Sequence, residues 1–231
     1  MSVLRTYSDA LVLTGRALAK SPWTLLLPAA YAAVLVPASA IAGAFGILGG
    51  FLYALVVDAL LASALYVVSE LVTGSRVQLK ELPQSVRHYF WPIMNVLFVL
   101  WIAGFVVRPL LHAVPNAGAL MLGIWAVLFI LLNAVPEILY RRGTYGGLAA
   151  IGESVAFVQE HWLVWLPPNL AVAALLWFGL PVVDALPLGV VLGPAVGGAL
   201  VFTTLVFRGH LFAALDGTTA RQRALRQRLG R

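Results

Sequence analysis

The sequence predicts an all-α integral membrane protein that crosses the bilayer six times. Of its 231 residues, 61% are hydrophobic and only 10% are charged, whereas a soluble domain has about 25% charged residues. The mean hydropathy is +0.95. Six stretches approach or exceed the roughly 20 mostly apolar residues that a membrane helix needs. The chain contains no cysteine, which excludes disulfides and thiolate catalysis and leaves the compartment open.

The first segment, "MSVLRTYSDALVLTGRALAKSP", predicts an amphipathic surface helix and not a signal peptide. Asp9 interrupts its apolar residues, and no small-residue cleavage site follows them. At helical spacing, Leu4, Tyr7, Leu11 and Leu18 share one face. A helix with one apolar face that adjoins a membrane span is expected to lie in the headgroup plane.

The six predicted spans are grouped in pairs. Their ranges are 22–46, 48–72, 91–113, 117–140, 163–184 and 187–214. Within each pair the connection is a short turn: "AFGILGGF", "HAVPNAG" and "VDALPLG". Three helical hairpins are therefore predicted. Prolines inside spans can kink them, and here these are Pro37, Pro136 and Pro194.

The two long connections predict further surface helices, because apolar residues again recur three or four apart. Those residues are Leu79, Leu82, Val86 and Phe90, and then Leu148, Ile151, Val155 and Val158. Each surface helix meets its span at a tryptophan (Trp23, Trp91 or Trp162), and the indole ring favours the membrane–water boundary. We interpret the chain as one membrane domain of three repeats, 1–74, 75–143 and 144–216, with a basic tail at 217–231.

The basic residues predict the orientation. Fourteen of the fifteen lysines and arginines fall in the N-terminal segment, the long connections, the tail or the adjoining span ends. Only Arg108 lies toward the other side. The positive-inside rule then places both termini and all three surface helices in the cytoplasm.

Small residues four apart predict close helix packing in two spans. The sixth span carries Gly189, Gly193 and Gly197, and the first carries Ala38, Ala42, Gly46 and Gly50. Packing within one chain and packing between copies of the chain are both open.

Asp58 is the main candidate for a functional group inside the membrane, because an ionisable residue there is costly. It could relay protons, coordinate a cation or pair with Arg108, for which Asp184 is a competing partner. A structural ion pair or a protonated Asp58 is the alternative. Glu137 and Arg208 could likewise pair across the bundle or face headgroups. The polar residues Asn95, Asn133 and Asn169 could line a cavity, and we expect them to join helices instead.

No metal site, cofactor or catalytic constellation is predicted. The four histidines lack metal-ligand spacing, and no HExxH or GxSxG motif occurs. The segment "DGTTARQRALRQRLG" resembles the opening of the motif of CDP-alcohol phosphatidyltransferases, in which four aspartates hold divalent metals. Asp216 would match one of them. Ala213 stands where the preceding aspartate belongs, and one carboxylate cannot form a two-metal site.

The tail is therefore interpreted as a basic, weakly amphipathic segment that binds anionic lipid headgroups. Its arginines are Arg221, Arg223, Arg226, Arg228 and Arg231. A role as a topology determinant alone is the alternative, and no nucleic-acid partner is expected.

The repeated unit resembles multi-pass bacterial membrane families related to the glycerophosphodiesterase membrane domain. The segments "ELVTGSRVQLKEL" and "ILYRRGTYGGLAAIGESVAF" carry the resemblance, since in each a span ends, a glycine follows and a surface helix begins. The resemblance implies a fold and a bacterial plasma membrane, and it implies no chemistry.

We expect a non-enzymatic membrane protein that acts as a lipid-interacting scaffold, as a homo-oligomer or as a subunit of a larger assembly. The alternative is a small transporter component that uses Asp58 together with the span asparagines. A membrane enzyme of phosphate chemistry is the third and weakest hypothesis.

Overall fold

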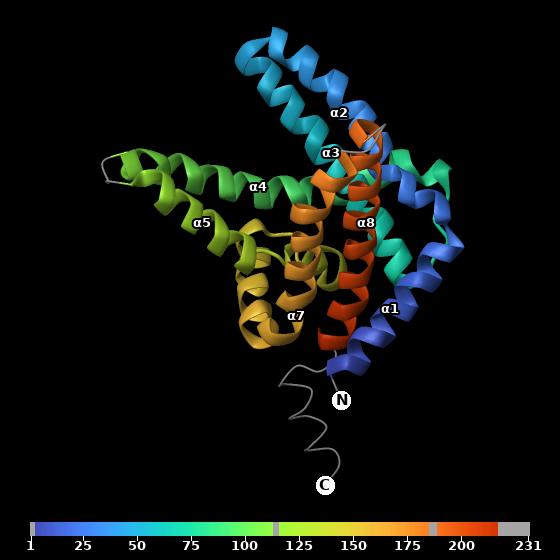
Figure 1. The fold of residues 1–231 in the computed structure, drawn as a ribbon. Helices are drawn as coiled ribbons and strands as arrows, with labels where there is room; N and C mark the ends of the chain where they lie inside the picture. Colours follow the sequence, from blue (N-terminus) through green and yellow to red (C-terminus); the bar gives the residue numbers. More distant parts are fainter. Residues whose placement is uncertain (1–2, 113–115, 185–188, 217–231) are drawn as a thin grey trace. The chain divides into compact units, whose positions relative to one another are not determined.

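The computed structural model describes residues 3–112, 116–184 and 189–216, and every element in these ranges is helical (Figure 1). The elements are α1 (Val3–Lys20), η1 (Pro22–Leu26), α2 (Leu27–Ala44), α3 (Gly46–Thr73), η2 (Leu79–Glu81), α4 (Leu82–His112), α5 (Ala117–Leu131), α6 (Val135–Glu137), η3 (Ile138–Arg142), α7 (Gly147–Asp184) and α8 (Gly189–Asp216). Within the described residues, six helical stretches are long and apolar enough to cross a membrane. The predicted all-α, multi-pass membrane character is thus confirmed.

The second and third predicted surface segments are continuous with the spans that follow them. Helix α4 contains Trp91 and Pro92 without a break, and α7 passes through Trp162 in the same way. No glycine or proline lies between Val158 and Leu163, so nothing there ends a helix. Among the three segments, α1 is the one that forms a separate helix, because Ser21 and Pro22 end it. Whether the other two lie in the headgroup plane stays a prediction.

The fourth span is interrupted between α5 and α6. Pro136 has no N–H to offer the carbonyl of Leu132, and Val135 N–H donates to that oxygen instead at 3.1 Å. The Ser154 hydroxyl, from α7, donates to the carbonyl of Leu131 at 2.8 Å. The proline-induced break is therefore stabilised by a neighbouring helix, as helix breaks inside membranes require.

The chain divides into two compact units. One contains Met1–Val34, Val67–Val77 and Leu163–Arg231, and the other contains Leu35–Tyr66 and Gln78–Trp162. Neither unit follows the boundaries of the three predicted repeats, so the repeat stays a prediction.

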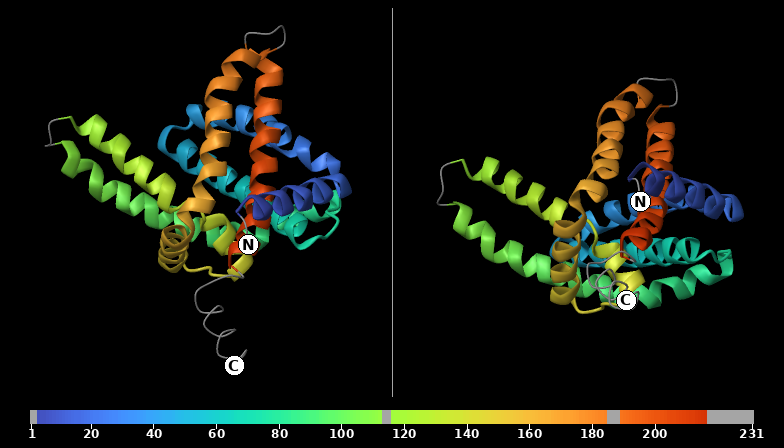
Figure 2. Two further views of the ribbon diagram at one scale, coloured as in Figure 1. Left: turned by 60° about the horizontal axis from the view of Figure 1, so that its bottom comes forward. Right: turned by 90° about the horizontal axis from the view of Figure 1, so that it is seen from below.

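In the first unit, α1 lies against α8 (Figure 1 and Figure 2). Its buried residues are small: Ala10, Thr14 and Ala17, which share one side of the helix. Leu4 is 77% exposed and Leu11 is 60% exposed. The helix thus packs on the protein through small residues and leaves the predicted leucine face largely open.

A hydrogen bond joins α1 to α7 in the same unit. The Tyr7 hydroxyl donates to the carbonyl of Val164 at 2.7 Å. In a regular helix that carbonyl would accept from residue 168, which is Pro168 and has no N–H. Tyr7 therefore supplies the donor that the proline removes, and burial raises the pKa of its hydroxyl.

In the second unit, α2 and α3 are joined by a turn at Phe45, whose N–H donates to the Ala42 carbonyl at 3.0 Å. Gly46 follows with φ +56°, a conformation in which a side chain would be strained. A Cβ atom on Gly49 would overlap the Ala42 carbonyl, so glycine is required for this close approach.

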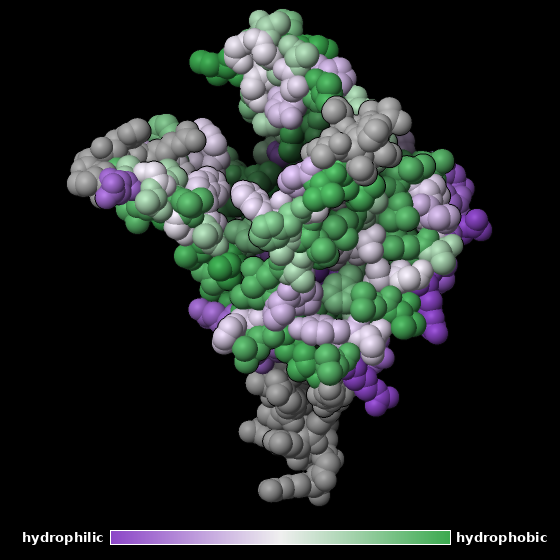
Figure 3. All heavy atoms as spheres, in the orientation of Figure 1, coloured by the Kyte–Doolittle hydropathy of each residue, from purple (hydrophilic) through white to green (hydrophobic). Residues whose placement is uncertain are grey.

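The surface of the helices is mostly apolar. Figure 3 shows hydrophobic residues over most of the face in view and strongly hydrophilic residues in small separate groups. In Pro22–Ala44 and in Gly147–Val183, the rest of the chain leaves nearly all of the most apolar stretch exposed. Such a surface requires hydrocarbon or other apolar helices around it.

Candidate functional site

Asp58 lies within α3 and is buried, at 5% exposure. It stands twelve residues after Gly46, or about 18 Å along the helix axis, which is near the middle of α3 (Gly46–Thr73). The side chains of its predicted partner Arg108 and of the competitor Asp184 lie outside the described residues. Their pairing therefore stays a prediction.

The structure describes all three predicted asparagines, two of them with a hydrogen bond to a backbone carbonyl. Asn95 Nδ2 donates to the Tyr145 carbonyl at 3.2 Å and connects α4 to the segment before α7. Asn169 Nδ2 donates to the Trp165 carbonyl one turn earlier in α7 at 2.6 Å. Asn133 is buried in the break between α5 and α6. The bond of Asn169 thus stays within one helix and that of Asn95 reaches a connecting segment, so the expectation that the asparagines join helices stays a prediction.

Glu137 and Arg208 are both buried, with 1% and 8% exposure, so neither faces headgroups. The Arg208 guanidinium lies 5.0 Å from the ring centroid of Trp165, a cation–π contact between α8 and α7. Phe212 meets the same ring edge-on at 6.1 Å. Trp165 is completely buried. Arg208 therefore belongs to the interior of the first unit, and its predicted pairing with Glu137 stays a prediction.

Sequence reasoning missed a polar contact between α3 and α4. The Ser85 hydroxyl donates to Ser63 Oγ at 2.9 Å, and both side chains are buried. One turn further along each helix, Tyr66 and His88 meet edge-to-face with ring centroids 6.2 Å apart. Hydroxyls inside apolar spans commonly bond between helices, so the serine in "LLASALY" was a usable signal.

The small residues of α8 pack within the chain at the positions that the structure describes. A Cβ on Gly197 would lie 2.9 Å from Leu180 Cδ2 of α7, and a Cβ on Gly198 would lie 2.6 Å from Pro28 Cβ of α2. Gly193 is buried, and the surroundings of Gly189 are outside the description. On α3, a Cβ on Gly50 would meet no atom within 4 Å. The predicted Gly50 position thus has open space around it, and the neighbouring Gly49 makes the close contact.

The predicted boundary residues and basic segments are partly described. Trp91 and Trp162 are exposed and Trp23 is half-buried. The basic connections form local contacts: Lys20 Nζ donates to the Gly74 carbonyl at 3.0 Å, and Arg142 pairs with Glu153 at 3.0 Å. Exposed pairs of this kind contribute about 0–1 kcal/mol.

The tail with Arg221, Arg223, Arg226, Arg228 and Arg231 lies outside the described residues, as does the motif after Asp216.

Among the residues that the structure describes, no three His, Cys, Asp or Glu side chains are grouped so that they could hold a metal ion. Among the described polar groups, Ser63 and Ser85 connect two helices, Asn133 lies at a break, and Asn169 bonds within its own helix. These features identify an integral membrane protein, and none of them identifies a reaction. No family model matches this chain, and no curated protein or solved structure is significantly similar to it.

Proposed function

We propose that this is a non-enzymatic membrane protein that interacts with lipid and acts as a scaffold or as a subunit of a larger membrane assembly. The observation that carries the proposal is the geometry of α1. Ala10, Thr14 and Ala17 pack on the protein, whereas Leu4 and Leu11 on a neighbouring face stay exposed. Such a helix has one side for the protein and another for the membrane.

The charged side of α1 completes the argument. Arg5, Asp9, Arg16 and Lys20 are all exposed, and at 100° per residue they lie roughly opposite the leucines. Burying a leucine in acyl chains contributes about 1.5–3 kcal/mol, and each basic residue near an anionic leaflet contributes about 1 kcal/mol. Anionic phospholipid is therefore the partner with matching chemistry.

The finer architecture belongs to the same proposal. We infer three hairpins, each preceded by a surface helix, in a threefold repeat, with both termini in the cytoplasm and the spans in a bacterial plasma membrane. The clustering of basic residues in the N-terminal segment, the long connections and the tail supports this orientation. Gly74 and Gly143, at φ +87° and +68°, end the helices before the second and third surface segments, which supports a repeated unit.

Assembly with further chains is supported by the exposed apolar surface of the spans. Open space around Gly43, Gly50 and Gly123 would let another helix approach closely. The proposed tail contact of Arg221, Arg223, Arg226 and Arg228 with headgroups would hold such an assembly near the cytoplasmic leaflet.

The test is the mass of the intact particle extracted from its native membrane into lipid nanodiscs. We expect a protein mass several times 24.7 kDa or a constant partner chain, together with retained anionic lipid. The paired variant Leu4→Ser, Leu11→Ser should lose anionic lipid relative to the control Ser8→Ala. A monomer that retains neither lipid nor partner would contradict the proposal.

A transporter component is the second candidate, and the burial of Asp58 inside a span favours it. In this case Asp58→Asn should abolish flux of a proton or cation in reconstituted vesicles while the protein still folds. Unchanged flux would exclude Asp58 as the coupling group.

A further inference from the structure

The α2–α3 turn has an unusually apolar sequence. Between Ser39 and Tyr53 there is no polar side chain, although this stretch includes the turn itself. Ile47 is 96% exposed, and Phe45 and Phe51 are each 60% exposed. The turns predicted for the other two hairpins differ, because they contain or adjoin His112, Asn116 or Asp184.

Such a turn is unfavourable in water, because three large apolar side chains would be hydrated there. It is favourable inside the hydrocarbon or at its edge. If the chain spans the membrane as proposed above, this end of the hairpin is surrounded by acyl chains of the leaflet opposite the basic segments.

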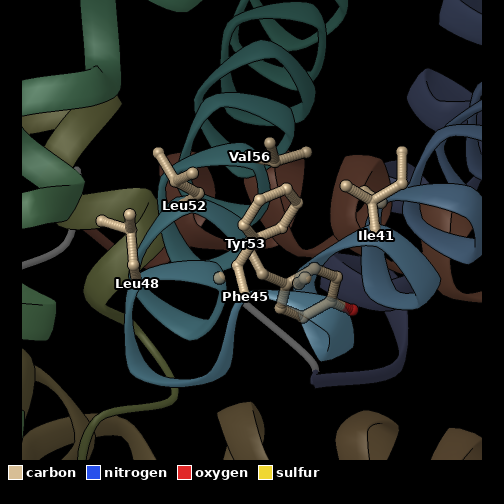
Figure 4. A pocket seen from close by; sticks show the side chains of 9 residues that line it. Ile41, Phe45, Leu48, Leu52, Tyr53 and Val56 are labelled. Carbon is tan, nitrogen blue, oxygen red and sulfur yellow. The ribbon is translucent and has the colours of Figure 1, made fainter.

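A groove between α2 and α3 opens at this end of the second unit (Figure 4). Its volume is about 340 Å³. The side chains of Ile41, Phe45, Leu48, Leu52, Tyr53 and Val56 surround it, and Ala38, Ala42 and Gly49 complete the lining. Eight of these nine residues carry no polar side-chain atom, with Tyr53 as the exception.

The lining decides the chemistry of the occupant. Ordered water needs two to four polar partners, and a lipid headgroup needs charge or several donors, whereas the Tyr53 hydroxyl is the one polar side-chain group in this lining. A flexible hydrocarbon chain needs neither. The groove volume of about 340 Å³ lies at the lower end of small-molecule sites, about 300–1,000 Å³, whereas a single turn of a helix, about 10–12 Å wide and 5.4 Å long with its side chains, occupies about 400–600 Å³. A single chain therefore suits the groove better than a helix of another copy.

We propose that this groove binds one acyl chain of a phospholipid from the leaflet opposite the basic segments. The inference rests on the proposed membrane placement and gives the protein a specific lipid contact in addition to the headgroup contacts of α1. It is independent of how many copies assemble.

The test uses nanodiscs of phosphatidylcholine whose acyl chain carries a diazirine, followed by illumination and peptide mass spectrometry. Ala38→Phe fills the groove from α2, and Val56→Phe fills it from α3. Ala40→Phe is the matched control, because Ala40 lies on α2, is exposed and does not line the groove. We expect crosslinks to concentrate on residues 41–56 and to fall severalfold in both filling variants but not in the control.

Equal crosslinking in the parent and all three variants, or crosslinks spread evenly over the exposed span residues, would overturn the inference. Groove crosslinks that are missing from particles of several copies and appear only after the particle is dissociated to monomers would also overturn it, in favour of a helix of a second copy as the occupant. If the particle keeps its mass and its partners but the crosslinks do not concentrate on residues 41–56, only the proposed acyl-chain site is refuted. If no span residue is crosslinked at all, the proposed membrane placement fails with it.

Discussion

Replacing Tyr7 with phenylalanine removes one hydroxyl and leaves the Val164 carbonyl without its donor. The bond is 2.7 Å long, and Pro168 cannot replace it because proline has no N–H. An unsatisfied buried carbonyl costs about 1–3 kcal/mol, and this bond is only partly buried; hydrogen bonds measured inside membrane proteins average about 0.6 and reach about 1.7 kcal/mol. We therefore expect Tyr7→Phe to weaken the packing of α1 by about 1–2 kcal/mol, or a factor of about 5–30.

The absence of native cysteine makes this measurable. Ala17→Cys places a thiol on the buried face of α1, where Ala17 is 5% exposed. When the helix closes faster than the reagent reacts, the labelling rate with a maleimide follows the open fraction. Tyr7→Phe should then raise the rate by about 5- to 30-fold, and Tyr145→Phe, at an exposed tyrosine, should leave it unchanged.

A second background separates this hydrogen bond from general loosening. Pro168→Ala returns an N–H to the helix opposite the Val164 carbonyl. In that background, adding Tyr7→Phe should change the labelling rate by less than about threefold, since the carbonyl then has another donor. An equally large effect of Tyr7→Phe with and without Pro168, or no effect in either, would refute the reasoning.

Three further predictions concern titration, packing and charge. Burial raises the pKa of Tyr7, so the neutral hydroxyl contributes fully to stability below the ordinary pKa of about 10, and this contribution is lost as pH rises through the higher pKa of the folded protein. The difference in tyrosinate absorbance between the parent and Tyr7→Phe should therefore show a group that ionises above about pH 10. Ionisation at or below that pH would contradict the prediction. Gly49→Ala should lower the free energy of unfolding by more than about 2 kcal/mol, because the added Cβ would overlap the Ala42 carbonyl. Gly50→Ala is the control and should leave the stability unchanged. Equal melting temperatures of the two variants would contradict this prediction. If Glu137 and Arg208 pair as the sequence suggests, Glu137→Gln and Arg208→Gln should each lower the free energy of unfolding by about 3–5 kcal/mol. The double variant should then lose clearly less stability than the sum of the two single variants. Additive losses of stability would exclude the pair.

Much of the fold follows from hydropathy alone, and the details of packing do not. Runs of apolar residues fix where a helix can cross a membrane, so four of the six apolar helices lie close to their predicted ranges, whereas the third and fifth begin earlier, at Leu79 and Gly147. The leucines of α1 predicted its apolar face, yet Ala10, Thr14 and Ala17 are the residues that it buries. Periodicity cannot distinguish a face that meets lipid from one that meets protein, because both are free of charge.

Local backbone chemistry explains other differences. Pro136 was expected to kink its span. Instead the span is interrupted: α5 ends at Leu131, five residues before this proline, and three residues of turn precede α6. Continuity of α4 and α7 was not foreseen, because a change in hydropathy does not itself end a helix. The partner of the carbonyl freed by Pro168 could not be found from sequence, since Tyr7 lies 157 positions away from Val164.

The most direct test of the central claim labels single cysteines with a membrane-impermeant maleimide, first on intact cells and then on opened membranes. Ser75→Cys and Tyr145→Cys lie in the two long connections, and Gly118→Cys lies near the turn between α4 and α5. The account predicts that Gly118→Cys reacts in intact cells, while Ser75→Cys and Tyr145→Cys react only after the membrane is opened. Reaction of all three from the same side would show that α4 and the α5–η3 stretch do not cross the bilayer, and the six-span account would be contradicted.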